Sequence, residues 1–238
     1  MHLSKWEIVR RYILLCVGLM IMATGIAFSI KADLGTTPIS SVPFVFSEFT
    51  PVSVGVATVL MNLAFVVLQV LILRRDFQPI QLMQIPVSFL FGFSTDVALG
   101  LISGITVTDT GEQWLLCILG VLLVGLGVAC EVTANVVVAA GEGLVLAITT
   151  ALKRRWDVHF PTIKISFDVT LVVISLTLSL LFVGGMRGVG LGTVAAALLV
   201  GLTAKCMARP MGWVNRRVLM GLPRRISVDD AALAPVAA

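Results

Sequence analysis

The sequence alternates long apolar runs with short clusters of arginine and lysine, and few folds accommodate that pattern. An α-helix rises 1.5 Å per residue, so a run of about twenty apolar residues crosses the roughly 30 Å hydrocarbon core of a bilayer. Of the 238 residues, 58% are hydrophobic and 13% are charged, and the mean hydropathy is +1.05. A water-soluble domain would need polar residues at helical spacing within these runs. The sequence therefore predicts an all-α membrane protein, and the lipid bilayer is one of its expected partners.

Six runs are long enough to cross a bilayer. The predicted transmembrane helices are residues 12–30, 52–73, 80–105, 113–138, 161–183 and 191–207. Residues 208–238 are predicted to form a cytoplasmic tail that is partly disordered. The stretch after the first run is a poor signal-peptide cleavage site, so we expect the first run to be retained as a helix.

The basic residues orient the predicted spans. When the N-terminus is placed in the cytoplasm and six spans are threaded, nearly all lysines and arginines fall on the cytoplasmic side, as the positive-inside rule requires. Lys31 and Arg187 fall on the other side. We therefore expect a multi-pass protein of the bacterial inner membrane with both termini in the cytoplasm. Because the arginines sit at span ends, we expect no nucleic acid as a partner.

The two halves of the sequence, residues 1–105 and 113–207, resemble each other at three places in the same order. The aligned pairs are Gly25–Asp33 with Gly127–Asn135, Met61-Asn62 with Phe167-Asp168, and Gly92–Asp96 with Gly201–Lys205. Each half holds three spans, so the halves are expected to be inverted repeats, the plan of many secondary transporters. A duplication kept only for packing would give the same pattern.

A short segment rich in helix breakers follows the first span of each half. In the first half, Thr37 and Pro38 suit the N-cap and first position of a helix, which predicts a half-helix over 38–49. In the second half, Gly141-Glu142-Gly143 leads into a predicted half-helix over 143–152. Both are too short to cross a bilayer, so they either re-enter it or lie flat on its surfaces. Two N-termini meeting inside would present free N–H groups and form a polar site.

Ionisable side chains inside apolar spans are costly and usually face the protein interior. Glu131 and Asp168 are the predicted intramembrane charges, which contact a coupling proton or cation or else form a buried polar pair that joins helices. Lys164 lies four residues before Asp168, on the same helix face. The predicted substrate-binding residues are Asp33, Thr36, Thr37, Ser40, Asn135 and Glu142.

No nucleophile–base pair, zinc signature or nucleotide-binding motif is found in the sequence. The four cysteines lie in apolar runs and are interpreted as small buried side chains. The sequence therefore predicts no enzyme, no cofactor and no metal site.

Part of the chain resembles the YczE/YitT-type bacterial membrane proteins. The resemblance rests on Arg11-Tyr-Ile-Leu, Gly18-Leu, Gly25-Ile-Ala, Ile30-Lys-Ala-Asp-Leu-Gly-Thr-Thr-Pro38 and Gly92-x-Ser-x-Asp96. The second half, at Ala134–Gly143, lacks the Leu-Gly-Thr-x-Pro pattern. The resemblance implies an integral membrane protein with a suspected transport role, and some relatives are linked to secondary-metabolite production.

The leading functional prediction is a secondary transporter or exporter of a small polar or zwitterionic molecule, coupled to a proton or cation through Glu131 or Asp168. The alternative is a membrane scaffold or regulatory protein that supports a cytoplasmic partner through the basic residues Arg209–Arg225. The identity of the substrate, the direction of transport and the formation of a homo-oligomer are left open by the sequence.

Overall fold

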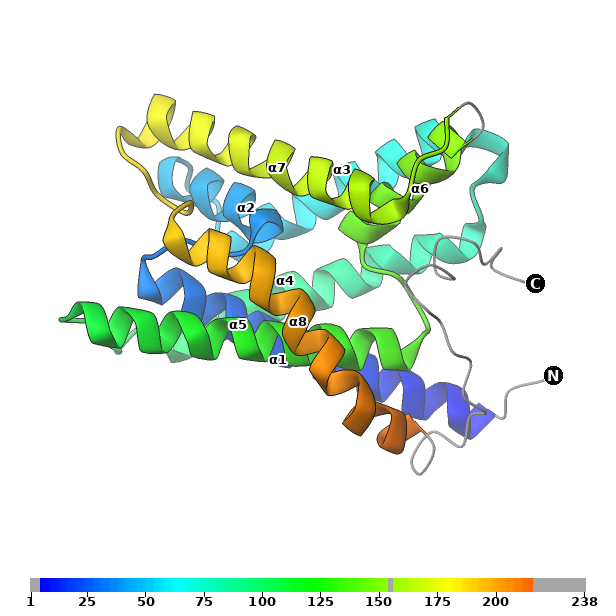
Figure 1. The fold of residues 1–238 in the computed structure, drawn as a ribbon, viewed down its shortest axis with the longest axis horizontal. Coiled ribbons are helices and arrows are strands. Elements are labelled where there is room, and N and C mark those ends of the chain that lie inside the picture. Colours follow the sequence, from blue (N-terminus) through cyan, green and yellow to red (C-terminus); the bar gives the residue numbers. More distant parts are fainter. Residues whose placement is uncertain (1–4, 154–155, 216–238) are drawn as a thin grey trace.

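The computed structural model describes residues 5–153 and 156–215, and these residues form eight α-helices (Figure 1). Six helices are long and apolar enough to cross a membrane, namely α1 (Lys5–Ala32), α3 (Val54–Leu73), α4 (Gln84–Leu101), α5 (Thr110–Ala134), α7 (Phe160–Leu178) and α8 (Leu191–Val214). The shorter helices α2 (Pro38–Phe49) and α6 (Ala140–Lys153) follow α1 and α5. The 3-10 helices η1 (Arg74–Asp76) and η2 (Pro79–Met83) join α3 to α4, and the π-helical turn η3 (Ser179–Val183) extends α7. The six apolar helices indicate a multi-pass membrane protein in contact with lipid.

Local interactions set several helix ends away from the predicted boundaries. α5 ends at Ala134, before residue 138, because Asn135 adopts the left-handed conformation with φ 49° and donates its N–H to the Glu131 carbonyl. α8 continues beyond residue 207 to Val214. The predicted tail from residue 216 onward lies outside the described residues.

α1 begins at Lys5, ahead of the predicted residue 12, because its polar first turns find partners. The guanidinium of Arg11 pairs with the carboxylate of Glu7 at 3.1 Å. The same guanidinium donates to the carbonyl oxygen of Ala134 at 3.1 Å, at the end of α5. The extra turns of α1 therefore hold the end of α5 in place.

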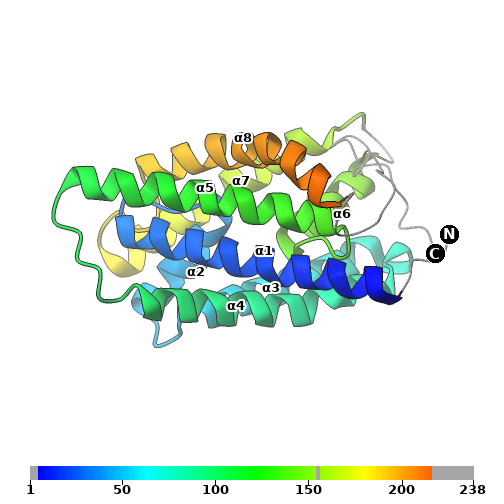
Figure 2. The same ribbon diagram turned by 90° about the horizontal axis from the view of Figure 1, so that it is seen from below.

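α1 and α5 run antiparallel and pack along their lengths (Figure 2). Gly18 lies against Gly127, and Gly25 lies against Gly120. A Cβ atom added at Gly25 would lie 2.6 Å from the carbonyl oxygen of Gly120, so the two backbones are in direct contact and only glycine fits. α4 packs against α1, and α8 packs against α5.

The short helices α2 and α6 lie inside the bundle, where both contact α3 and α7. The central valines of the two helices, Val45 and Val145, are fully buried. Their first turns meet: the side chain of Ile39 contacts Gly141 and packs against a buried cluster that includes Ala140. From this point the two helices run toward opposite ends of the molecule (Figure 1). This burial does not fit the alternative in which the two helices lie flat on opposite surfaces.

The start of α1 and the end of α8 lie at the same end of the bundle (Figure 1), which we call the basic end. The lysines and arginines at or toward this end are Lys5, Arg10, Arg11, Arg74, Arg75, Lys153, Lys164, Lys205 and Arg209. Lys31 and Arg187 lie at the opposite end. Which end faces the cytoplasm stays a prediction of the positive-inside rule.

Candidate functional site

The structure places the predicted site residues in two groups, on either side of the contact between Ile39 and Gly141. The group toward the opposite end contains Asp33, Thr36, Thr37 and Ser40. The group toward the basic end contains Glu131, Asn135, Glu142 and Asp168. The first turns of α2 and α6 separate the two groups.

The first group is organised by the connection between α1 and α2, which is tied to the connection before α8. Asp33 follows the end of α1 in the left-handed conformation with φ 54°. Its two carboxylate oxygens accept hydrogen bonds from Nη1 of Arg187 at 3.1 and 3.2 Å. The N–H of Thr36 donates to the Gly188 carbonyl at 3.1 Å, and the N–H of Gly192 donates to the Leu34 carbonyl at 2.7 Å. One ion pair and two backbone hydrogen bonds therefore hold these connections together.

The hydroxyls of Thr37 and Ser40 are used in starting α2. Thr37 is the N-cap, and its Oγ1 accepts from the N–H of Ser40 at 3.4 Å and donates to Ser40 Oγ at 2.9 Å. Thr36 differs, because its side chain is 1% exposed and its Oγ1 has no hydrogen-bond partner among the described residues. A buried hydroxyl without a partner lowers the stability of the folded state by about 1–3 kcal/mol. Thr36 is therefore a candidate for a functional role.

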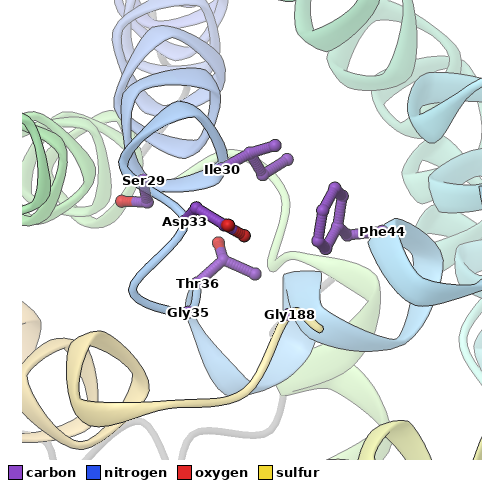
Figure 3. A pocket seen from close by; sticks show the side chains of 7 residues that line it. All are labelled: Ser29, Ile30, Asp33, Gly35, Thr36, Phe44 and Gly188. Carbon is purple, nitrogen blue, oxygen red and sulfur yellow. The ribbon is translucent and has the colours of Figure 1, made fainter. Parts of the chain in front are cut away.

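Thr36 lines a pocket beside Asp33 (Figure 3). The residues that line this pocket, called here the Asp33 pocket, are Ser29, Ile30, Asp33, Gly35, Thr36, Phe44 and Gly188. Figure 3 shows the Asp33 carboxylate and the Thr36 hydroxyl side by side, with the ring of Phe44 across from them. The pocket has no internal space that would hold a water molecule. The Asp33 pocket is therefore closed in this conformation.

The second group is built around the start of α6. Glu131 is 7% exposed, and its Oε1 accepts a hydrogen bond from the N–H of Ala139 at 2.9 Å. A carboxylate at this position satisfies an N–H at the helix start and faces the positive end of the helix dipole. The charge of Glu131 also interacts with that of Glu142, in the first turn of α6.

Glu142 is partly exposed and interacts electrostatically with Lys164 and Asp168 on α7. The ammonium of Lys164 pairs with Asp168 Oδ1 at 2.7 Å, and their side chains are 29% and 26% exposed. We call Glu131, Glu142, Lys164 and Asp168 the acidic cluster, because Glu142 interacts with Glu131 on one side and with the Lys164–Asp168 pair on the other. Asn135 is exposed and serves as the C-cap of α5.

Two buried glutamines next to the acidic cluster were missed by the sequence analysis. Gln69 of α3 is fully buried, and its Nε2 donates to Gln84 Oε1 at 2.9 Å and to the Ala140 carbonyl at 3.0 Å. Gln84 Nε2 returns a hydrogen bond to Gln69 Oε1 at 3.2 Å. This pair joins α3, α4 and the start of α6. The signal was present, since each glutamine interrupts an apolar stretch.

Asp96, which the sequence aligns with Lys205 but does not predict as a site residue, joins α3 to α4 near the opposite end. Its carboxylate accepts from Ser53 Oγ at 2.6 Å and from the N–H of Gly55 at 2.7 Å. Close by, a Cβ atom added at Gly92 would lie 2.5 Å from the Gly55 carbonyl oxygen. Gly201, which aligns with Gly92 in the second half, would find nothing within 4 Å of an added Cβ atom. The two halves therefore differ in how closely their last two helices approach.

No group of three or more histidine, cysteine, aspartate or glutamate side chains is placed to hold a metal ion within residues 5–153 and 156–215. The cysteines Cys16, Cys117, Cys130 and Cys206 are free thiols. The chemistry on which a function can be built is therefore that of the Asp33 pocket and the acidic cluster.

A family model described as "Family of unknown function (DUF6198)" matches residues 9–209. The chain is also similar to the "Uncharacterized protein YyaS" of Bacillus subtilis (strain 168), with 26% identity over 194 residues, which are 81% of this chain and 89% of the relative. No solved structure matches the chain. The resemblance to YczE/YitT-type proteins stays a prediction, because neither match carries that name.

Proposed function

We propose that this chain, which belongs to the family of unknown function DUF6198, is a secondary transporter and not an enzyme. Its substrate would be a small polar or zwitterionic molecule. The observation that carries the proposal is the meeting of the first turns of α2 and α6 inside the bundle, at Ile39 and Gly141. Broken helices that start at membrane depth, with polar groups on both sides, are how many secondary transporters build a substrate path.

Symmetric contacts between α1 and α5 support an arrangement of two inverted repeats. The alignment of Gly25 with Gly127 carries Gly18 onto Gly120. Exchanging the halves therefore turns the contact of Gly18 with Gly127 into that of Gly120 with Gly25, and the structure has both contacts. A two-fold axis between the helices would produce this pairing.

The contacts of the short helices support the same axis. The alignment carries Ile39 onto Gly141, so their contact would lie on the axis itself. The packing of α2 against α7 becomes that of α6 against α3 when the halves are exchanged, and both contacts are present. The packing of α1 against α4 likewise becomes that of α5 against α8, and both of these are present as well. The repeats are least alike in their last two helices.

That difference supports a state that is closed at the opposite end and open toward the basic end. At the opposite end, Asp96 and the contact of Gly55 with Gly92 hold α3 against α4. In the second half α7 and α8 diverge (Figure 1), and Gly201 has no neighbour within 4 Å of an added Cβ atom. With the basic end in the cytoplasm, this is an inward-facing carrier. We expect the start of α7 to close onto Gly201 as the Asp33 pocket opens.

The acidic cluster supports proton or cation coupling through Glu131 or Asp168. Glu131 holds the start of α6 through Ala139, so a change in its protonation would alter how α6 is fixed. Asp168 pairs with Lys164, and its release from that pair would change the charge next to Glu142. A change in the charge of either carboxylate would therefore alter the position of the start of α6, and alternating access requires such a link between charge and helix position.

The test is transport by the purified full-length chain in proteoliposomes. Counterflow of labelled zwitterions and amines would identify a transported compound, and a pH gradient would test its accumulation. We expect Glu131→Gln or Asp168→Asn to retain counterflow but lose accumulation, because exchange needs no coupling charge. Glu48→Gln, at an exposed carboxylate of α2, is the matched control and should behave as wild type. The coupling assignment is wrong if neither Glu131 nor Asp168 affects accumulation, and the carrier proposal fails if no compound moves.

A further inference from the structure

We infer, on the basis of the proposed carrier function, that the substrate is a small zwitterion whose ammonium group binds in the Asp33 pocket and whose carboxylate binds Arg187. The pocket places a carboxylate and a hydroxyl opposite an aromatic ring (Figure 3). A carboxylate attracts an ammonium group by charge, and an aromatic ring attracts it through its electron-rich face. The chemistry around Asp33 and Phe44 is therefore that of a site for an organic cation.

In the closed structure an internal cation already occupies the carboxylate. Nη1 of Arg187 lies 3.1 and 3.2 Å from the two carboxylate oxygens of Asp33. The two side chains are 49% and 50% exposed, and such exposed ion pairs contribute only about 0–1 kcal/mol. A ligand ammonium can therefore replace Arg187 at little cost. The displaced guanidinium then offers paired N–H donors to the ligand carboxylate, which a purely cationic ligand lacks.

Thr36 supplies a second, independent sign of a ligand. Its hydroxyl is buried at the pocket wall and has no hydrogen-bond partner among the described residues. Native proteins rarely leave such a group unpaired, and a ligand carboxylate would accept a hydrogen bond from this hydroxyl. Thr36 also lies directly before Thr37, the N-cap of α2, and the N-terminus of a helix favours negative charge. The carboxylate of the zwitterion is therefore expected near Thr36 and Arg187.

Binding is linked to opening because the pocket has no room while it is closed. The bonds from Thr36 N–H to Gly188 and from Gly192 N–H to Leu34 join the two connections that cover it. A ligand enters only when these connections part, and the exchange of the Asp33–Arg187 pair for two ligand contacts offsets part of that cost. The same step would open the opposite end of the carrier.

Three compounds of nearly equal shape separate the chemical classes. Glycine betaine carries both charges, choline carries only the trimethylammonium group, and 3,3-dimethylbutyrate carries only the carboxylate. Binding of each is measured on the full-length chain in lipid nanodiscs by displacement of labelled glycine betaine. We expect wild type to bind glycine betaine at least tenfold more tightly than choline, and 3,3-dimethylbutyrate most weakly.

The variants give a pattern that a structural role would not produce. Asp33→Asn should weaken glycine betaine and choline at least tenfold each, because both need the carboxylate. Arg187→Gln should weaken glycine betaine but strengthen choline about twofold to fivefold, because the competing internal cation is gone. Thr36→Val should raise the melting temperature and yet weaken glycine betaine about threefold to tenfold. Phe44→Leu should weaken the binding of choline, because it removes the aromatic ring and leaves an apolar side chain.

The inference is overturned if wild type binds none of the three at millimolar concentration, if 3,3-dimethylbutyrate binds best, or if Arg187→Gln weakens choline. The carrier proposal is judged separately, by flux. If another compound shows counterflow that Asp33→Asn does not affect, the carrier proposal is supported and the Asp33 pocket is not its substrate site. If glycine betaine binds with the predicted variant pattern but no flux is found, the binding site is supported and the carrier proposal is contradicted.

Discussion

Alanine at Gly92 and alanine at Gly201 should have opposite consequences, although the two glycines occupy aligned positions. At Gly92 the added methyl group would lie 2.5 Å from the Gly55 carbonyl oxygen and 2.6 Å from Cγ2 of Val59. The carbonyl belongs to a helix backbone, so α3 and α4 must separate. Overpacking of this kind costs about 1–3 kcal/mol. At Gly201 nothing lies within 4 Å, and alanine there should change the free energy of unfolding by less than about 1 kcal/mol, toward stability.

Unfolding in mixed detergent micelles measures both differences in stability. The effect of Gly201→Ala on transport should differ from its effect on stability, because its methyl group occupies the surface onto which α7 is expected to close. We expect the Gly201→Ala carrier to be at least as stable as wild type but to transport at a reduced rate. Equal destabilisation by the two substitutions would refute the packing argument. Unchanged transport by Gly201→Ala would refute the closure of α7 onto α8.

Three further predictions concern single contacts. Gln69→Leu should lower the free energy of unfolding by about 1–3 kcal/mol, because Gln84 and the Ala140 carbonyl lose their partner inside the bundle, and the same micelle assay measures it. Asp33→Asn should lower the free energy of unfolding by at most about 1 kcal/mol, because the ion pair with Arg187 is half-exposed. A larger loss would indicate that the pair has a structural role. Deletion of residues 216–238 should leave flux unchanged in proteoliposomes, whereas a scaffold acting through this tail would lose its function.

The local features of the fold could be predicted from the sequence. Apolar runs identify the six long helices because crossing a bilayer sets a minimum helix length. The start of α2 follows from Thr37 and Pro38, since an N-cap hydroxyl and a proline at the first position act within one turn. In the second half, the boundary at Asn135 was less evident, because an asparagine in the left-handed conformation leaves no unique sequence signal.

The site depends on contacts between distant residues, and these could not be predicted from spacing. Arg187 reaches Asp33 only because the connection before α8 folds over the end of α1. Asp96 looks like an intramembrane charge in the sequence, yet it caps the start of α3 from the neighbouring helix. The repeat suggested equivalent positions in the two halves. It could not show that Gly92 is in tight contact while Gly201 is not.

A covalent link between Ile39→Cys and Gly141→Cys, in a chain whose native cysteines are replaced by serine, tests the carrier most directly. The side chain of Ile39 contacts Gly141, so a short dithiol-bridging reagent should join the two cysteines within one chain. We predict that the link forms in membranes, stops counterflow, and releases it again on reduction. Absence of the link would contradict the meeting of α2 and α6, and undiminished flux through the linked chain would contradict alternating access at this contact.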